Sequence, residues 1–365
     1  MSEIRLAIAG VGNCASALVQ GIDYYRHRRP GGDVVLFNKV GGYGISDIRP
    51  VAAFDVDRRK VGRPLHEAVF AEPNCTKVFQ RDLTDHGVTV LMGPVLDGVA
   101  DHMAEYPDAQ SFRVADEAPS DVAAVLRETG AEVLVCYLPV GSEEAVRHYA
   151  RACLEAGVAM VNCMPVFIAS DPDWAAEFAA AGLPIVGDDI KSQAGATVAH
   201  RTLARLLADR GVDIKRTYQL NTGGNTDFLN MLERKRLSSK KLSKTEAVQS
   251  QLDVPLAPEN IHIGPSDYVP WQKDNKVCYI RIEWEGFGGV PMEMELKMSV
   301  EDSPNSAGVA VDAIRCAKLA SDRGLGGPLE AVSALYMKHP PVQMRDSDAY
   351  RKVKEWTDGS MLAGS

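Results

Sequence analysis

Residues 4–15 read IRLAIAGVGNCA, and this stretch decides the fold of the chain. Ile4 to Ala9 are almost all apolar and predict a short buried strand, and residues 10–15 then match the pattern G-x-G-x-x-A. Apolar residues recur at helical spacing over the next stretch, from Ala15 to Arg28. A strand, a tight glycine turn and a helix in this order are typical of the first unit of a doubly wound α/β domain.

The same alternation of strand and helix continues through the first half of the chain. Continuous apolar strands separated by helices predict a parallel sheet with helices on both faces. The further predicted strands are Val51 to Phe54, Val133 to Leu138, Val158 to Asn162 and Pro184 to Val186, and the predicted helices include Asp121 to Thr129 and Glu143 to Ala156. The first half is therefore predicted to be a Rossmann-like domain.

The pattern changes after a long helical segment from about Ala194 to Arg210. Apolar and polar residues then alternate, which predicts antiparallel strands with one face open to water, a common surface for oligomer formation. These strands are expected at Lys215 to Thr222, Val277 to Glu285 and Pro291 to Ser299. Helical periodicity returns at Asn305 to Ser321 and Leu329 to Met337. We expect these last helices to pack on the first domain, because they have no other sheet to cover.

The predicted fold is α/β, with a Rossmann-like doubly wound parallel sheet and an inserted α+β domain that has a largely antiparallel sheet. We expect a nucleotide-binding domain over 1–200, a second domain for catalysis and oligomer formation over 201–303, and helices over 304–365 that return to the first domain. The glycine-rich stretch 30–47 is longer than an ordinary connection and is expected to be a surface loop or a lid. The charged tail from Gln343 onward is expected to be loosely held.

Composition disfavours several classes of protein. With 40 basic against 49 acidic side chains, the 365-residue chain has a formal charge of -9, which disfavours nucleic acid and anionic lipid as partners. No apolar run reaches the roughly 18 residues of a membrane span, and the N-terminus lacks a signal-peptide pattern, so we expect a cytoplasmic protein that does not bind a membrane. The cysteines are scattered and form no C-x-x-C pair, which is typical of reduced thiols in a core.

The glycine turn predicts a binding site for a dinucleotide. Gly10 permits the tight turn, Gly12 lets the backbone approach a pyrophosphate, and the small Ala15 allows the helix to pack closely. Asn13 and Cys14 lie where the helix begins and where its N–H groups face an anion. We expect Asn13 to keep a polar contact and Cys14 to be a small packing residue rather than a reactive thiol.

A carboxylate for the ribose hydroxyls is expected at the end of the second strand, and Asp55 stands there. Asp57 is the rival for this role. An acid at this place favours NAD over NADP, but Arg58, Arg59 and Lys60 follow closely and offer an alternative site for a 2′-phosphate.

The second half carries a concentrated basic stretch inside an acidic protein. Its members are Arg234, Lys235, Arg236, Lys240, Lys241 and Lys244. The ordinary explanation of such a run is a solvated face. However, polar and acidic turns precede it at 187–189 and 222–227, and Lys276 and Lys338 follow beside apolar segments. Clustered lysines lower one another's pKa values, which supplies neutral amines as bases and keeps charged partners for a phosphate or an enolate.

Five segments together resemble those of the inositol-1-phosphate synthase family. They are Gly187-Asp-Asp-Ile-Lys-Ser, Gly224-Asn-Thr-Asp, Ser239-Lys-Lys-Leu-Ser-Lys, Asp274-Asn-Lys-Val and Val300-Glu-Asp-Ser. Their order and spacing agree with the family from the glycine turn to Lys338, and the length is similar to that of its shorter prokaryotic members.

The resemblance implies an isomerase of the intramolecular lyase type that converts D-glucose 6-phosphate to 1L-myo-inositol 1-phosphate. In that reaction C5 is oxidised with NAD, the ketone acidifies C6, the C6 enolate attacks the C1 aldehyde in an intramolecular aldol step, and C5 is reduced again. The reaction is redox-neutral overall. The family also implies a homotetramer and a place in inositol and phospholipid biosynthesis.

The family's functional residues carry over to the matching positions of this sequence. The implied catalytic group is Lys240, Lys244, Lys276, Lys338, Asp189 and Asp227. The substrate phosphate is assigned to Ser192, Lys244 and Thr197, although this chain reads Ser-Gln-Ala-Gly-Ala-Thr where many members have S-G-Q-T. The cofactor is assigned to Gly10, Gly12, Asn13, Cys14, Ala15, Asp55, Asp189 and Asp302. A cation of unknown identity is implied at Asp302 and Ser303, and two oxygens alone do not specify a metal.

Two alternatives share the glycine turn. A conventional NAD(P)-dependent dehydrogenase of a small carboxylic or amino-acid substrate explains the turn and the second domain, but it has no use for four lysines. A non-catalytic NAD-sensing oligomer predicts nucleotide binding without turnover and also leaves the lysines unexplained. The histidines lack the spacing of a zinc pair, and the absence of a G-x-S-x-G motif disfavours a hydrolase.

Overall fold

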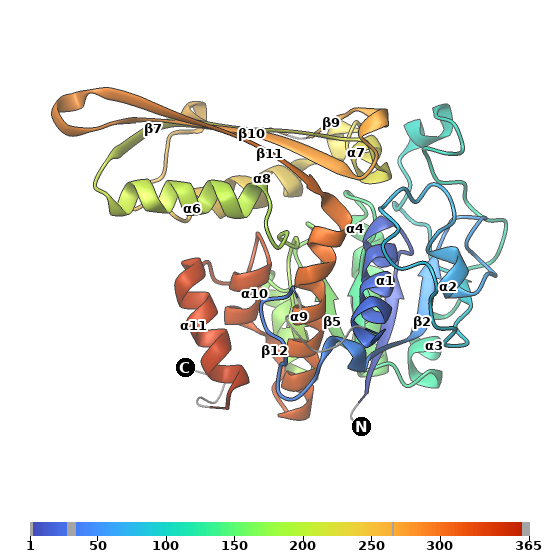
Figure 1. Cartoon of the computed structure of the whole chain (residues 1–365). Helices are drawn as coiled ribbons and strands as arrows, with labels where there is room; N and C mark the ends of the chain where they lie inside the picture. Colours follow the sequence, from blue (N-terminus) through green and yellow to red (C-terminus); the bar gives the residue numbers. More distant parts are fainter. Residues whose placement is uncertain (1–2, 28–33, 265, 360–365) are drawn as a thin grey trace.

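The computed structural model of the chain describes residues 3–27, 34–264 and 266–359. Figure 1 shows two layers: an α/β body built on a seven-stranded sheet, and a long flat sheet that lies across the top of this body. In the part of the chain that is described, no helix has the length and apolar character needed to cross a bilayer.

The large sheet is parallel throughout, in the order β12-β6-β5-β4-β1-β2-β3. Its strands are β1 Ile4–Ala9, β2 Ile48–Asp55, β3 Val90–Met92, β4 Val133–Cys136, β5 Ala159–Asn162, β6 Pro184–Val186 and β12 Gly327–Pro328. The strand order runs outward in both directions from β1 and β4, which is the doubly wound topology. This confirms the predicted fold class, and all five strands predicted for the first half are present.

Helices cover both faces of this sheet, because successive apolar side chains of a strand point to opposite faces. On β1, Ile4, Leu6 and Ile8 face one helical layer, whereas Ala7 and Ala9 face the other. The first layer contains α1 Asn13–His27, α2 Leu65–Ala68, α9 Asp302–Asp322 and α10 Glu330–Tyr336, and the second contains α3 Val122–Glu128, α4 Glu143–Ala156 and α5 Pro172–Ala180. Helix α9 packs beside α1, so the two ends of the sequence share one core.

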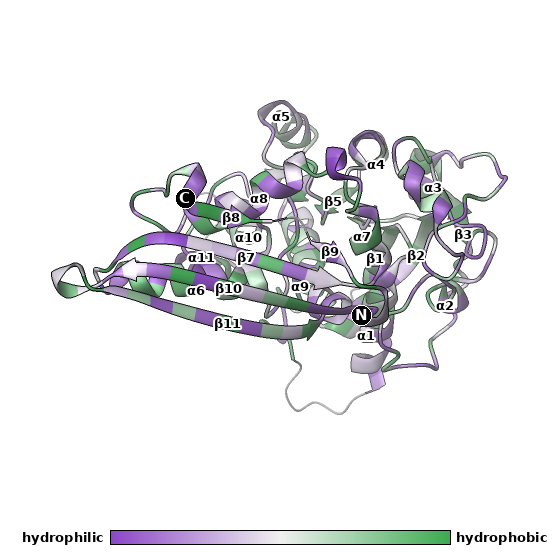
Figure 2. Ribbon diagram, turned by 90° about the horizontal axis from the view of Figure 1, so that it is seen from above, coloured by the Kyte–Doolittle hydropathy of each residue, from purple (hydrophilic) through white to green (hydrophobic). Residues whose placement is uncertain are grey.

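The flat upper sheet has the order β11-β10-β7-β8, and β9 also pairs with β7. Its strands are β7 Asp213–Gly223, β8 Ile261–Ile263, β9 Asp267–Tyr268, β10 Asn275–Glu285 and β11 Pro291–Glu301. The three long strands are antiparallel, as predicted, whereas the short β8 and β9 run parallel to β7. Figure 2 shows hydrophilic and hydrophobic residues alternating along the long strands. The apolar face packs on α6 Ala196–Asp209 and α8 Ser238–Gln249.

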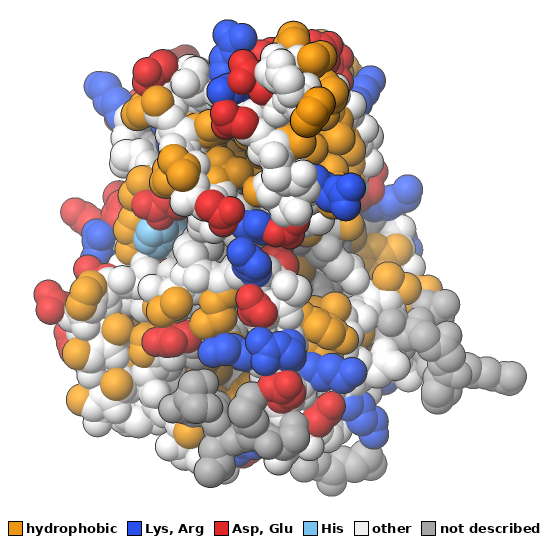
Figure 3. All heavy atoms as spheres, turned by 90° about the vertical axis from the view of Figure 1, so that its left-hand side faces the viewer, with side chains coloured by type: hydrophobic (Ala, Val, Ile, Leu, Met, Phe, Trp, Pro, Cys, Tyr) orange, Lys and Arg blue, Asp and Glu red, His pale blue; other side chains and the backbone are white. Residues whose placement is uncertain are grey.

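The β11 side of the upper sheet is open. β11 forms the edge of the sheet, and Phe287, Val290 and Met292 are exposed at and beside the hairpin tip between β10 and β11. Figure 3 looks at this end of the molecule and shows hydrophobic side chains gathered on its upper part. An uncovered edge strand beside exposed apolar residues is a surface on which another chain can dock.

The described part of the glycine-rich stretch, residues 34–47, is a surface loop held on α9. The buried guanidinium of Arg315 donates hydrogen bonds to the carbonyl oxygens of Phe37 (2.7 Å), Asn38 (3.1 Å) and Tyr43 (3.2 Å). None of these described loop residues lines the cleft at the carboxyl ends of β1, β4 and β5. Residues 30–33 of the predicted insertion lie outside the described part of the chain.

The prediction of a loosely held tail is wrong for residues 343–359. Helix α11 Asp346–Thr357 buries Ala349, Val353 and Trp356, which recur at helical spacing and were hidden by the many charges between them. Tyr350 of the same helix stacks on Phe37, with ring centres 5.6 Å apart. The end of the predicted tail, 360–365, lies outside the described residues.

Truncation of this apolar stripe tests whether the tail is structural. Because Trp356 is only 5% exposed, Trp356→Ala should lower the free energy of unfolding by about 3 kcal/mol. Chemical denaturation followed by circular dichroism measures the change. Lys354→Ala, on an exposed site of the same helix, is the matched control and should change it by less than about 0.5 kcal/mol. Equal stability of the two variants would show that the tail is not part of the core.

Candidate active site

A deep cleft lies at the carboxyl ends of β1, β4 and β5, and the upper layer supplies its other wall. This is the switch point of the doubly wound sheet, where ligands bind in such folds. The cleft has a volume of about 1430 Å³, including space open to solvent.

The glycine turn at one end of the cleft fits a pyrophosphate. Gly10 has φ +91°, and a Cβ there would lie 2.5 Å from the carbonyl oxygen of Tyr137. A Cβ on Gly12 would meet nothing within 4 Å, which leaves open space over the turn where α1 begins. Ala15 is buried behind the turn and does not line the cleft, so it acts through packing.

Asp55, rather than Asp57, lines the cleft. Asp55 Oδ2 accepts the backbone N–H of Val11 at 2.7 Å, so the carboxylate is fixed against the glycine turn. Asp57 is fully buried and is held by Arg59, with 2.6 Å between Asp57 Oδ2 and Arg59 Nη2. Burial acts to raise its pKa, but hydrogen bonds from Arg59 and Arg113 and the charge of Lys60 lower it below its ordinary value. The structure therefore makes Asp57 a structural carboxylate.

The three basic residues that offered a 2′-phosphate site are separated in the fold. Arg58 pairs with Asp108 on the surface (3.0 Å), and Arg59 is held by Asp57. Only Lys60 lines the cleft, with its Nζ 3.0 Å from Asn74 Oδ1 and 3.8 Å from Asp55 Oδ2. Among the described residues, no arginine lines the cleft.

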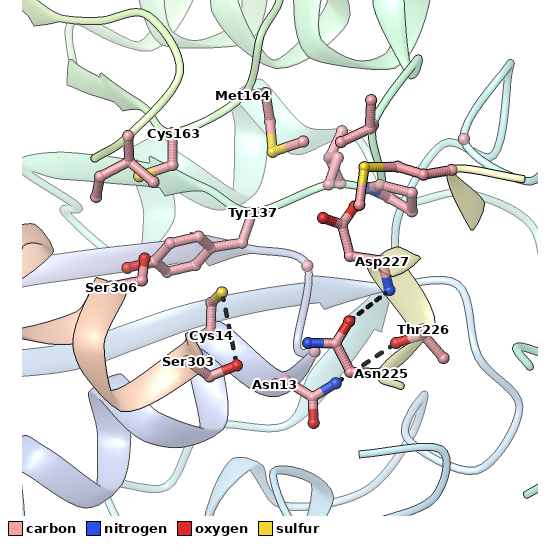
Figure 4. A pocket seen from close by; sticks show the side chains of 18 of the residues that line it. Asn13, Cys14, Tyr137, Cys163, Met164, Asn225, Thr226, Asp227, Ser303 and Ser306 are labelled. Atoms are coloured by element: carbon pink, nitrogen blue, oxygen red, sulfur yellow. Dashed lines mark hydrogen bonds between the residues drawn. The ribbon is translucent and has the colours of Figure 1, made fainter. Parts of the chain in front are cut away.

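Asn13 and Cys14 face the second half of the chain across the cleft. Asn13 Oδ1 accepts the backbone N–H groups of Cys75 (2.6 Å) and Thr76 (2.9 Å). Cys14 Sγ lies 4.0 Å from Ser303 Oγ, as Figure 4 shows. Burial raises the pKa of the Cys14 thiol to about 12, and nearby carboxylates add to the shift. This thiol is protonated at neutral pH and therefore a packing group.

The buried carboxylate of Asp189 holds two of the predicted lysines. Lys338 Nζ lies 2.8 Å and Lys240 Nζ 3.1 Å from Asp189 Oδ1, and the hydroxyl of Ser243 donates to Asp189 Oδ2. Burial acts to raise the pKa of this carboxyl, but the lysine charges lower it below its ordinary value. Asp189 does not line the cleft, so it stands behind the lysines and orients them.

The lysines differ in their readiness to lose a proton. Burial lowers the pKa of Lys244 well below its ordinary value, and neighbouring lysine charges lower it further. Burial also lowers the pKa of Lys338 to about 8, against the pull of Asp189. For Lys240 the charges of Asp189 and Asp227 outweigh burial and raise the pKa. The cleft therefore combines a firmly protonated ammonium with amines that can be neutral.

Lys276 and Asp227 complete the group of predicted catalytic residues that line the cleft. Lys276 stands on β10, with its Nζ 3.1 Å from Asp302 Oδ1 and 5.8 Å from the ring centre of Phe228. Asp227 lies in α7 Thr226–Asn230, and Asn225 caps this helix by accepting the backbone N–H of Asp227 at 3.0 Å (Figure 4). The sequence did not single out Asn225 as the cap that sets this orientation.

The predicted phosphate contacts are only partly brought together. Ser192 and Lys244 line the cleft, whereas Thr197 does not. Thr197 lies in the first turn of α6 and is largely buried there. The segment that departs from S-G-Q-T therefore contains Thr197, a predicted phosphate contact that lies outside the cleft.

Asp302 and Ser303 lie together at the start of α9 but do not form a metal site by themselves. Asp302 is bound by Lys276, and Ser303 Oγ donates to Asp274 Oδ1 at 2.8 Å. Within residues 3–27, 34–264 and 266–359, no group of three or more His, Cys, Asp or Glu side chains could hold a metal ion. These two oxygens, already engaged with protein groups, do not fit a cation on their own.

The buried carboxylate of Asp274 is a junction, because several elements of the fold donate hydrogen bonds to it. In the sequence, Asp274 stood out only as part of a motif. Its carboxylate accepts the hydroxyl of Thr76 (2.8 Å), the amide of Asn225 (2.9 Å), and the backbone N–H (3.2 Å) and hydroxyl (2.8 Å) of Ser303. Thr76 in turn contacts Asn13, so Asp274 ties the glycine turn to α7 and α9. Only the fold reveals this role, because the partners are far apart in sequence.

The chain is similar in sequence to known proteins. The model of the family described as myo-inositol-1-phosphate synthase matches residues 195–303. An inositol-3-phosphate synthase of Mycolicibacterium smegmatis is 54% identical over 363 residues, which cover 98% of each chain. Another, of Corynebacterium glutamicum, is 53% identical over 360 residues, covering 97% of this chain and 98% of that one. The chain belongs to the myo-inositol-1-phosphate synthase family.

Solved structures agree with this family. The crystal structure of Ari2 is 37% identical, with a TM-score of 0.77 over 98% of this chain and 99% of that one. A myo-inositol-1-phosphate synthase-related protein from Thermotoga maritima is 25% identical, with a TM-score of 0.77 and 98% of each chain covered. An inositol-3-phosphate synthase of Caenorhabditis elegans, 15% identical with a TM-score of 0.76, shares the fold. The resemblance found in the sequence of this family member is therefore confirmed.

Asp274→Asn tests the junction in this synthase-family cleft. Each oxygen of Asp274 accepts two hydrogen bonds. The amide nitrogen of asparagine cannot accept a hydrogen bond, so at either position it would face donors that it cannot satisfy. We expect weaker NAD binding and a turnover number lower by about 100-fold, because the two walls lose their common anchor. Nucleotide titration and steady-state assays measure these changes. Asp253→Asn, at an exposed site, is the control, and unaltered turnover in Asp274→Asn would contradict the role.

Proposed function

We propose that the chain converts D-glucose 6-phosphate to 1L-myo-inositol 1-phosphate with NAD as bound cofactor. The single observation that carries this proposal is that one cleft holds both the dinucleotide turn and four lysines from the second half of the chain. The names of its relatives, inositol-3-phosphate synthases covered over nearly their whole length, support the same activity. The overall reaction is an isomerisation of the intramolecular lyase type.

The reaction consists of oxidation at C5, enolisation at C6, an intramolecular aldol step and re-reduction at C5. The nicotinamide, when bound, supplies reversible two-electron chemistry at C5. The proton lost from C6 passes to a base, the C6–C1 bond forms, and the C1 oxygen takes up a proton as it becomes an alcohol. Since the electrons removed from C5 return to it, substrate and product have the same composition.

The lysines suit these steps because their protonation differs. Lys240 stays protonated beside Asp189 and can stabilise a developing oxyanion. Lys244 and Lys338, whose pKa values are lowered, can accept and return protons near neutral pH. Lys276 faces the same cleft and provides a further cationic donor. Several anionic centres form in turn, so several such groups are needed.

The cofactor proposal is NAD rather than NADP. Asp55 lines the cleft beside the turn, and an acid there favours free ribose hydroxyls. The engagement of Arg58 and Arg59 elsewhere removes two of the cations that a 2′-phosphate needs. A conventional dehydrogenase is the weaker alternative, because it gives no task to the lysines around Asp189.

The remaining parts of the proposal rest on the family. We propose that 1–200 bind NAD, that 201–303 serve catalysis and assembly, and that 304–365 return to the first domain. A homotetramer would use the open edge at β11, where Val290 and Met292 are exposed. A cation at Asp302 and Ser303 would need ligands from the bound cofactor, and no step above uses it. The cytoplasmic location stays a prediction from the sequence.

Product analysis tests the function directly. Purified protein incubated with glucose 6-phosphate and catalytic NAD should yield an inositol monophosphate by NMR, with no net NADH absorbance. Lys276→Ala should still bind the sugar phosphate but turn over at least about 100-fold more slowly, because a cationic donor is lost. Accumulating NADH, or unchanged sugar phosphate with NAD binding confirmed, would favour the dehydrogenase alternative.

The rate should also depend on pH through Lys338. As the pH rises through about 8, this lysine loses its proton, and we expect kcat/KM to rise with the fraction of neutral amine. Lys338→Arg cannot deprotonate in this range, so the rising limb should disappear with most of the activity. A pH–rate profile of both proteins measures this. A wild-type rate that does not change across this range would remove Lys338 from the proton transfer.

A further inference from the structure

A second cavity adjoins the catalytic cleft on the outer side of α8. The short 3₁₀ turn Arg234–Arg236 and the first residues of α8 form its wall, and Lys240 and Lys244 line both this cavity and the cleft. The two cavities therefore meet at the same lysines. Of the predicted active-site residues, only these two lysines line the second cavity.

The cations of this cavity exceed the anions that face them. Lys240 is neutralised by Asp189 (3.1 Å), and Arg234 by Asp267 (2.8 Å). Lys235, Lys241 and Lys244 also line the cavity. Within the described residues, the side chains of these three form no hydrogen bond and no ion pair. Three uncompensated amines thus share one hollow in a chain of net charge -9.

Lys244 distinguishes this cavity from a solvated helix face. Lys244 is only 5% exposed, so its amine has little access to bulk water except through the two cavities that it lines. A buried amine that forms no ion pair is costly to keep charged, and an anion on its open side stabilises the charged form. Ser238, in the same wall, adds a hydroxyl that can donate to an oxyanion.

We infer that the second cavity binds a phosphate dianion next to the active site. This inference rests on the proposed function and extends it: the cavity takes a phosphate monoester or inorganic phosphate, held by Lys235, Lys241 and Lys244. Lysines bind phosphate as mobile point charges, which suits a site that must release its ligand. Because Lys244 faces both cavities, an anion held here lies one side chain away from the cleft in which the sugar phosphate reacts.

Two consequences follow from a cationic hollow at this place. Its field concentrates phosphorylated ligands beside the active site, so substrate capture should weaken as ionic strength rises. Free phosphate should compete with the sugar phosphate for the same lysines. Both effects concern capture of the substrate by Lys235 and Lys241, which are not assigned to the chemical steps.

The experiment compares phosphate binding by the NAD-saturated protein and its variants. Lys235→Gln/Lys241→Gln removes two charges from the cavity without touching the predicted catalytic residues. Lys352→Gln/Lys354→Gln, on α11, is the matched control with the same change in net charge. Inorganic phosphate is titrated by calorimetry and by phosphorus NMR. We expect two bound phosphates per wild-type and control chain, and one per cavity variant.

Kinetics give an independent reading of the same variants. In Lys235→Gln/Lys241→Gln we expect KM for glucose 6-phosphate to rise about 10-fold, with kcat within about twofold of wild type and a weaker dependence on salt. Repeating the titration with glucose 6-phosphate separates the two ligand sources. Loss of the second site for both ligands supports an entry site, and loss for inorganic phosphate alone supports a free-phosphate site.

The inference is overturned if wild type and cavity variant bind the same number of phosphates with the same affinity. This outcome is distinguishable from failure of the proposed function, because phosphate binding is measured without turnover. A protein that binds two phosphates but forms no inositol phosphate would contradict the proposed reaction and leave the cavity assignment standing.

Discussion

The arrangement of the cleft depends on one buried carboxylate. Asp189 is removed from water entirely, and a charge in that position persists only if other charges and donors compensate it. Lys240, Lys338 and Ser243 provide this compensation from two different elements, α8 and the segment after α10. The need to satisfy a single carboxylate therefore fixes where two lysines point and keeps the lysine helix against the body of the protein.

The same carboxylate explains why clustered lysines can coexist with different protonation. Lys240 lies against Asp189 and Asp227 and keeps its proton, whereas Lys244 has lysine neighbours and little water, so its pKa falls. Two lysines a single helical turn apart thus have pKa values shifted in opposite directions. Their difference comes from position relative to Asp189, which sequence spacing alone does not give.

A second junction joins the two halves of the molecule. Asp274 reaches the glycine turn through Thr76 and reaches α7 and α9 through Asn225 and Ser303. The glycine turn follows β1 of the parallel sheet, whereas Lys276 stands on β10 of the upper sheet, and the distance between them is set where these elements meet. Substrate oxidation and ring closure need one sugar to face both sites, so this junction matters as much as any group that touches the substrate.

The sequence by itself determined the fold class, five of the seven strands of the parallel sheet and the family, because hydrophobic periodicity and a few contiguous motifs carry that information. Most of the site residues that it predicted line the cleft. Only the tertiary structure chose Asp55 over Asp57, left Thr197 and Ala15 outside the cleft, placed Asp189 behind its lysines and packed the charged tail as a helix. Each of these depends on which distant side chains satisfy a buried charge or cover an apolar stripe, and such partners become neighbours only when the chain is folded.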